Sequence, residues 1–127
     1  MNTELAREGA HVETQLRQLD ESLALSRVGG DVELLKEVIG LFLNDYPTTF
    51  EKIKNAVAAS DATALEHHAH SLKGSVSTFG ADRAFEAAFE LEKQGRNKDL
   101  QRAGEGVLQL EQALEALRPE LETLQVK

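Results

Sequence analysis

The residues with the clearest chemical potential are three histidines in the middle of the chain, at His67, His68 and His70. The apolar residues around them recur every three or four positions, which predicts a helix over residues 62–79. At 100° per residue, His70 lies about 140° from the apolar stripe that starts at Leu65, so we expect it to face solvent. His68 falls near the edge of the stripe, where a structural role is expected.

The solvent side of this predicted helix also carries charged, small and hydroxyl side chains, at Glu66, His67, Lys73, Gly74 and Ser77. A neutral imidazole has one nucleophilic nitrogen when the other nitrogen holds the proton, so an exposed histidine can form a covalent phosphoryl intermediate. A nearby lysine offsets the charge of the phosphoryl oxygens. A glycine inside a helix costs about 1 kcal/mol relative to alanine, and close approach of a partner is a common reason for one. The set favours phosphoryl transfer through His70.

Other readings of these residues remain open. An exposed histidine or lysine is most often only a solvated side chain. For the function of the whole domain, the main alternative to phosphoryl transfer is an adaptor that binds a partner without being phosphorylated. His67 and His70, three residues apart, form at most a weak two-ligand metal site, because a metal centre needs ligands converging from several directions. We expect no metal and no cofactor. The sequence has no phosphate-binding loop or dinucleotide motif, so we expect no ATP site and no enzyme activity of its own.

The run Ala69-His70-Ser71-Leu72-Lys73-Gly74-Ser75 resembles the signature of histidine phosphotransfer domains, including the phosphoacceptor domain of chemotaxis kinases. The resemblance continues through Thr78-Phe79-Gly80-Ala81 and through Leu91-Glu92 with Arg96 shortly after, and it covers about residues 19–118. It implies a phosphorelay intermediate that takes a phosphoryl group from a kinase or a receiver aspartate and passes it to a response-regulator receiver domain.

By this resemblance, His70 is the phosphoacceptor and Lys73 is the charge partner of the phosphoryl group. Gly74 leaves room for the receiver. Ser77, Glu66 and His67 lie on the same predicted solvent face, and we expect them to border the partner-binding surface. The family often places a Gln or Glu on the next helix to bond the other ring nitrogen of the histidine, and the matching position here is Glu92. The resemblance also implies that the magnesium belongs to the receiver, and that the partners are receiver domains and a sensor histidine kinase.

Helical spacing runs through the rest of the chain, and strand signals are nearly absent. Apolar residues recur at helical spacing in an N-terminal segment with Val12, Leu16, Leu19 and Leu23, which ends at Gly29-Gly30. Asp31 is a predicted N-cap for a helix ending near Tyr46-Pro47, with a restart at Thr48 or Thr49. Ser60-Asp61 precedes the histidine helix.

Gly80 is predicted to end the histidine helix, and Asp82 to cap a shorter one that stops at Gly95. The last segment alternates apolar residues from Leu100 to Leu124, with Pro119 expected to kink or split it. Short connections between amphipathic helices imply antiparallel neighbours. The predicted fold is therefore all-α, an up-down antiparallel four-helix bundle with additional N-terminal helix or helices. Residues 1–18 are predicted to be a helical extension and residues 19–127 the domain.

Composition limits the partners. The 127 residues carry 14 basic and 22 acidic side chains, a net charge of −8, which disfavours nucleic acid and anionic lipid. No apolar stretch approaches the roughly 18 residues of a membrane helix, and no signal-peptide pattern is visible. The chain has no cysteine. We expect a monomeric cytoplasmic protein.

Overall fold

The computed structural model describes residues 18–127, and within that range the chain forms α-helices and no strand. The helices are α2 (Glu21–Arg27), α3 (Val32–Ala58), α4 (Ala62–Ser77), α5 (Asp82–Arg96) and α6 (Ala103–Gln125). The predicted helical extension lies outside the described residues, apart from Gln18.

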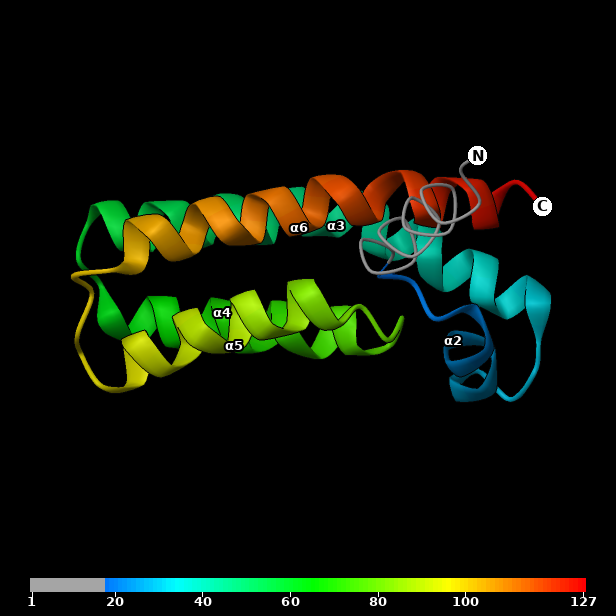
Figure 1. Cartoon of the computed structure of the whole chain (residues 1–127), viewed down its shortest axis with the longest axis horizontal. Helices are drawn as coiled ribbons and strands as arrows, with labels where there is room; N and C mark the ends of the chain where they lie inside the picture. The colour runs from blue at the N-terminus through cyan, green and yellow to red at the C-terminus, as the bar shows by residue number, and fades with distance from the viewer. Residues whose placement is uncertain (1–17) are drawn as a thin grey trace, which may run out of the picture.

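The four longer helices form an up-down bundle of two layers (Figure 1). In that view α3 and α6 lie side by side in one layer, and α4 and α5 form the other. Close backbone contacts run around the ring from α3 to α4, α5, α6 and back to α3. The short helix α2 contacts α3 at the end where α3 and α6 extend beyond the second layer. The predicted all-α bundle with an additional N-terminal helix is confirmed. In the described part of the chain, no helix is both long and apolar enough to cross a membrane.

Aspartates begin three of the helices. The side chains of Asp20, Asp31 and Asp61 each accept a hydrogen bond of 3.0 Å from the backbone N–H three residues later. Each satisfies one of the N–H groups that the first turn of a helix leaves unpaired. Gly29 and Gly30 precede the second of these caps with positive φ angles of 70° and 79°, so the predicted break between α2 and α3 is confirmed.

The expected break at Tyr46-Pro47 is wrong, because α3 continues through Pro47 without interruption. Pro119 likewise lies inside α6, which continues to Gln125 and is not split. Both prolines are exposed, whereas Phe50 and Leu121, which follow them on the core side, are buried. A proline inside a helix costs about 3 kcal/mol. The burial of apolar side chains on both sides of each proline outweighs that cost and keeps the helix continuous.

The start of α5 also differs from the prediction. Asp82 is the first residue of α5 and not its cap, and Ala81 at the cap position makes no side-chain cap bond. Gln18 supplies that function from a distance, because its Oε1 accepts a 3.0 Å bond from the Ala84 N–H. Its Nε2 donates a 2.7 Å bond to the carbonyl of Ala113 on α6. Gln18, predicted as the last residue of the extension, is therefore built into the bundle.

The sequence predicted that α5 ends at Gly95. The helix instead continues to Arg96, and Gly95 lies inside it at the contact with α4. A Cβ atom at Gly95 would lie 2.6 Å from the Glu66 nitrogen and 2.7 Å from the Ala62 oxygen. Such distances are too short for real Cβ contacts, so only glycine allows the two backbones to come this close. This approach sets the spacing between the helix that carries His70 and the helix that carries Glu92.

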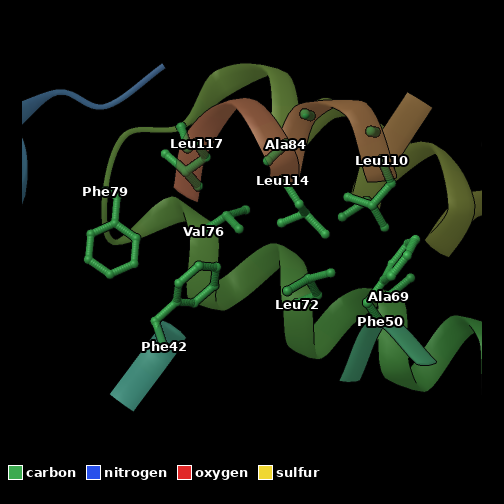
Figure 2. Packing of buried hydrophobic residues seen from close by; sticks show 14 of the residues in the cluster. Phe42, Phe50, Ala69, Leu72, Val76, Phe79, Ala84, Leu110, Leu114 and Leu117 are labelled. Atoms are coloured by element: carbon green, nitrogen blue, oxygen red, sulfur yellow. The ribbon is translucent and has the colours of Figure 1, made fainter. Parts of the chain in front are cut away.

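The apolar stripe of the histidine helix is buried, as predicted. Its members are at most 2% exposed, and they are Leu65, Ala69, Leu72, Val76 and Phe79. Figure 2 shows part of this stripe facing Leu110, Leu114 and Leu117 of α6 across the centre of the bundle. Phe42 packs edge-on against Phe79 at a ring distance of 5.2 Å. Burial of the stripe fixes the rotation of α4 about its axis, and therefore the direction in which its polar face points.

Candidate functional site

His70 lies on the outer side of α4, between the buried residues Ala69 and Leu72. Its side chain is 68% exposed, so the imidazole is accessible to a second macromolecule. The exposure follows from the helical period, since His70 is one residue past a buried alanine and two before a buried leucine. The predicted position of His70 on the solvent side is what the structure describes.

Glu92 contacts the ring nitrogen of this imidazole that faces the protein. It lies on α5, is only 2% exposed, and places Oε2 at 3.1 Å from His70 Nδ1. An ionised carboxylate can only accept, so a neutral His70 in this hydrogen bond carries its proton on Nδ1. The other nitrogen, Nε2, is then left with its lone pair free. The structure thus brings Glu92 to the place expected of an orienting residue, and its carboxylate is buried instead of exposed to solvent.

Two permanent cations share the same carboxylate. Lys73 Nζ lies 2.8 Å from Glu92 Oε1, and Arg96 Nη2 lies 2.6 Å from Oε2. Burial by itself would raise the pKa of Glu92, but hydrogen bonds from Lys73 and His70, together with their charges, bring the pKa below its usual value. Glu92 is therefore a buried, ionised carboxylate that accepts a hydrogen bond from Arg96, contacts Nδ1 of His70 and forms an ion pair with Lys73.

Lys73 is less free than the sequence suggested. Its side chain is 19% exposed, and its ammonium lies 4.8 Å from the ring centroid of Phe89 and 5.9 Å from that of Phe85. The predicted partner of the phosphoryl group is thus held against α5 by a carboxylate and two aromatic rings.

On the other side of His70, Glu66 accepts a 3.1 Å bond from Nε of Arg96. This bond raises the pKa of Arg96, and the carboxylate of Glu92 adds to the effect. Arg96 therefore joins α5 to α4 as well as to Glu92. These groups border a shallow hollow next to the imidazole, which is lined by Thr63, Glu66, His67, His70, Glu92 and Arg96.

Gly74 is exposed, and a Cβ atom added there would meet nothing within 4 Å. The surface one turn beyond His70 is therefore open, as expected. Ser77 is half-buried and its groups are used within the protein. Its hydroxyl donates a 2.8 Å bond to the Gly74 carbonyl, and its own carbonyl accepts a bond from the Arg27 guanidinium of α2. Ser77 supports the end of α4 as well as bordering the open surface.

His67 is exposed, and its ring lies 5.1 Å from that of half-buried His68. Burial lowers the pKa of His68, and the neighbouring His67 and Lys52 lower it further. No group of three or more His, Asp or Glu side chains that could hold a metal ion occurs among the residues from 18 onward.

Arg96 is the site residue that sequence reasoning left without a role. The signal was present, because Arg96 is four residues after Glu92 and so shares its helix face. What the pattern did not reveal is that one guanidinium contacts two carboxylates on different helices.

A four-helix bundle in which an exposed histidine contacts a buried carboxylate is compatible with a phosphotransfer module. The family model described as "Hpt domain" matches residues 37–120. A solved structure, the histidine-containing phosphotransfer protein B (HptB) from Pseudomonas aeruginosa PAO1, superposes with a TM-score of 0.79. It is 29% identical, and the match covers 85% of this chain and 94% of that one. No curated protein matches the sequence. The chain belongs to the Hpt domain family, and its role is histidine phosphotransfer in a phosphorelay.

Proposed function

We propose that His70 is the phosphoacceptor of this Hpt domain and that Glu92 orients it. The observation that supports this assignment is the 3.1 Å contact between His70 Nδ1 and a carboxylate that is almost completely buried. His67 is exposed on the same helix, but no carboxylate contact of its ring is found in residues 18–127. Of these two histidines, only His70 therefore has one nitrogen committed to the protein and the other directed to a partner.

The proposed reaction is an in-line exchange between two proteins. Nε2 of His70 attacks the phosphorus of an aspartyl phosphate on a receiver domain, a P–N bond forms, and the P–O bond to the aspartate breaks. The aspartate leaves as a carboxylate, and Nδ1 keeps its proton. The imidazole ring becomes more positive as the P–N bond forms, and the negative charge of Glu92 stabilises it there. The reverse sequence delivers the group to the next receiver.

In this proposal the chain is a phosphocarrier without its own ATP site, and its partners are receiver domains and a sensor histidine kinase. We place it in the cytoplasm, where such partners meet, and expect it to act as a monomer. The alternative is a bundle that binds a signalling partner without being phosphorylated. A purely adhesive surface does not require a buried carboxylate behind an exposed histidine, and burying a charge is costly unless it is paired. The site geometry therefore favours the carrier.

The test is to mix the chain with receiver domains charged by acetyl phosphate and to look for an acid-labile phosphohistidine. We expect His70→Gln to abolish acceptance and to change the unfolding free energy by less than about 0.5 kcal/mol, because the side chain is exposed. His67→Gln and His68→Gln leave His70 intact, so both variants should still form a phosphohistidine. A His70→Gln variant that still takes up phosphate would remove His70 from the mechanism.

A further inference from the structure

The surface beside His70 has two chemically different ends. Phe85, Phe89, Glu92 and Arg96 follow one another on α5 at intervals of four, three and four residues, so they share one face of the helix. Glu92 is at His70, and Arg96 continues towards Glu66. The two phenylalanines continue in the opposite direction. One end of the site is therefore charged and the other is aromatic.

Phe89 is the unusual residue of the aromatic end. It is half-buried, yet among the described residues it is not one of the apolar side chains that pack against the core, whereas Phe85 is. The neighbours of its ring are Phe85 at 6.1 Å and the ammonium groups of Lys73 and Lys93, each at 4.8 Å. The ring thus lies at the surface, one helical turn along α5 from Glu92.

A protein that reacts with His70 also has to cover surface around the histidine, and the aromatic end is the part of it that offers an apolar contact. Specific protein interfaces bury about 800 Å² on each partner. A contact surface of that size extends well beyond one histidine in every direction. The centres of such interfaces are enriched in aromatic residues and depleted of charge. The aromatic end also has the open surface at Gly74, which lies one residue after Lys73 on α4. At the charged end, Arg96 and Glu66 already satisfy each other.

We propose that Phe89, supported by Phe85, is the apolar anchor on which the receiver domain docks when it reaches His70. This inference rests on the proposed function, and it adds which end of the site carries the binding energy. The partner is a folded domain that bears a phosphoaspartate and presents apolar side chains next to it. Contact with Phe89 on one side and Gly74 on the other brings that phosphoaspartate over Nε2.

The ring of Phe89 has one competing role, which is to hold the ammonium of Lys73 through a cation–π contact. The two roles predict different kinetics. An anchor determines how much receiver is needed for half-maximal transfer, whereas a residue that positions Lys73 determines the rate once the receiver is bound. A leucine at position 89 separates them, because it keeps an apolar surface but offers no aromatic face to a cation.

The experiment is single-turnover transfer from a receiver domain charged with acetyl phosphate, with the receiver concentration varied. For Phe89→Ala we expect the half-saturating concentration to rise about tenfold, the usual size of an anchor's contribution, and the maximal rate to stay within about twofold. Phe89→Leu should recover most of the affinity. Leu108→Ala is the matched control, because Leu108 is 59% exposed on α6, a helix that makes no close backbone contact with α4. Circular dichroism establishes that each variant is folded.

The anchor is refuted if the half-saturating concentration of Phe89→Ala is unchanged. It is also refuted if Phe89→Ala and Phe89→Leu both lower only the maximal rate, which would assign Phe89 to Lys73. Calorimetric titration with uncharged receiver keeps this test apart from the phosphoacceptor assignment. His70→Gln should bind the receiver like the parent chain while accepting no phosphate, and Phe89→Ala should bind it weakly.

Discussion

Nδ1 of His70 and Oε2 of Glu92 lie 3.1 Å apart, although one side chain is 68% exposed and the other is almost completely buried. The contact joins the surface of α4 to the interior of the α4–α5 interface. Through Glu92, the reactive face of His70 is connected to Lys73 and Arg96. The orientation of the exposed ring is therefore determined by a buried network and not by the solvent-facing surface alone.

Replacing Glu92 with Gln should keep an acceptor for His70 but leave Lys73 without its counter-charge and Arg96 with Glu66 as its remaining carboxylate. We expect a loss of about 1–3 kcal/mol in unfolding free energy at neutral pH. The pKa of Glu92 is lowered in the folded state, so its ionised form stabilises the fold fully above the ordinary pKa of a glutamate. That contribution is lost as the pH falls through the lower, native pKa. Urea unfolding across this range should show the parent and the variant converging at acid pH.

Glu90→Gln is the control for this titration, because Glu90 is exposed and, among residues 18–127, forms a salt bridge only with Lys93, at 3.0 Å. The unfolding free energy of Glu90→Gln should differ little from that of the parent at any pH. If the difference in unfolding free energy between Glu92→Gln and the parent stays constant down to acid pH, the pKa of Glu92 is not lowered in the folded state.

Lys73→Met should slow transfer from a saturating receiver by about tenfold to a hundredfold, because it removes an ammonium that would offset the developing phosphoryl charge. Receiver binding should be unaffected, since the methylene stem is kept. Lys93→Met is a close match: its ammonium lies at the same 4.8 Å from the Phe89 ring but pairs with Glu90 instead of Glu92. Equal single-turnover rates for Lys73→Met and the parent would reduce Lys73 to a structural partner of Glu92.

Gly74→Gln places a side chain on the open surface one turn beyond His70. Removing a helical glycine should stabilise the fold by up to ~1 kcal/mol. Receiver-dependent transfer should nevertheless fall by about a hundredfold, because a displacement of about 1 Å between reacting groups has that effect. Gly104→Gln is the control, since Gly104 is also exposed with nothing near its Cβ position but lies on α6. Undiminished transfer by Gly74→Gln would mean that no partner approaches this face closely.

Gly95→Ala tests the spacing of α4 and α5. Helix propensity alone predicts that the substitution raises the free energy of unfolding by about 1 kcal/mol. The new Cβ would instead meet backbone atoms of Glu66 and Ala62, so the helices must separate, at a cost of about 1–3 kcal/mol. Thermal unfolding shows whether Gly95→Ala raises or lowers the stability of the fold. Gly104→Ala, which should be stabilising, is the reference. The separation should also weaken the Nδ1–H signal of His70 in nitrogen-15 NMR spectra. A more stable Gly95→Ala would show that the close approach is not required.

Features that depend on local periodicity could be predicted from the sequence. The apolar stripe from Leu65 to Phe79 determines which side of α4 is buried, and His70 is exposed because it is out of phase with that stripe. The caps at Asp31 and Asp61 and the glycine pair before Asp31 are equally local, because they satisfy or break the first turn of a helix without help from distant residues. The pairing of Glu92 with His70 could be expected only from the resemblance to the family.

The sequence by itself therefore determined the all-α class, the helix that carries the histidine and the side on which it faces solvent. The tertiary structure alone decided that α3 passes through Pro47, that Gln18 caps α5 and that Gly95 is a contact point instead of a helix end. It also decided that Lys73 and Arg96 share one buried carboxylate. The physical reason is that helical periodicity is a property of neighbouring residues. The distance between two helices, and the groups that meet across it, depend on packing summed over the whole bundle.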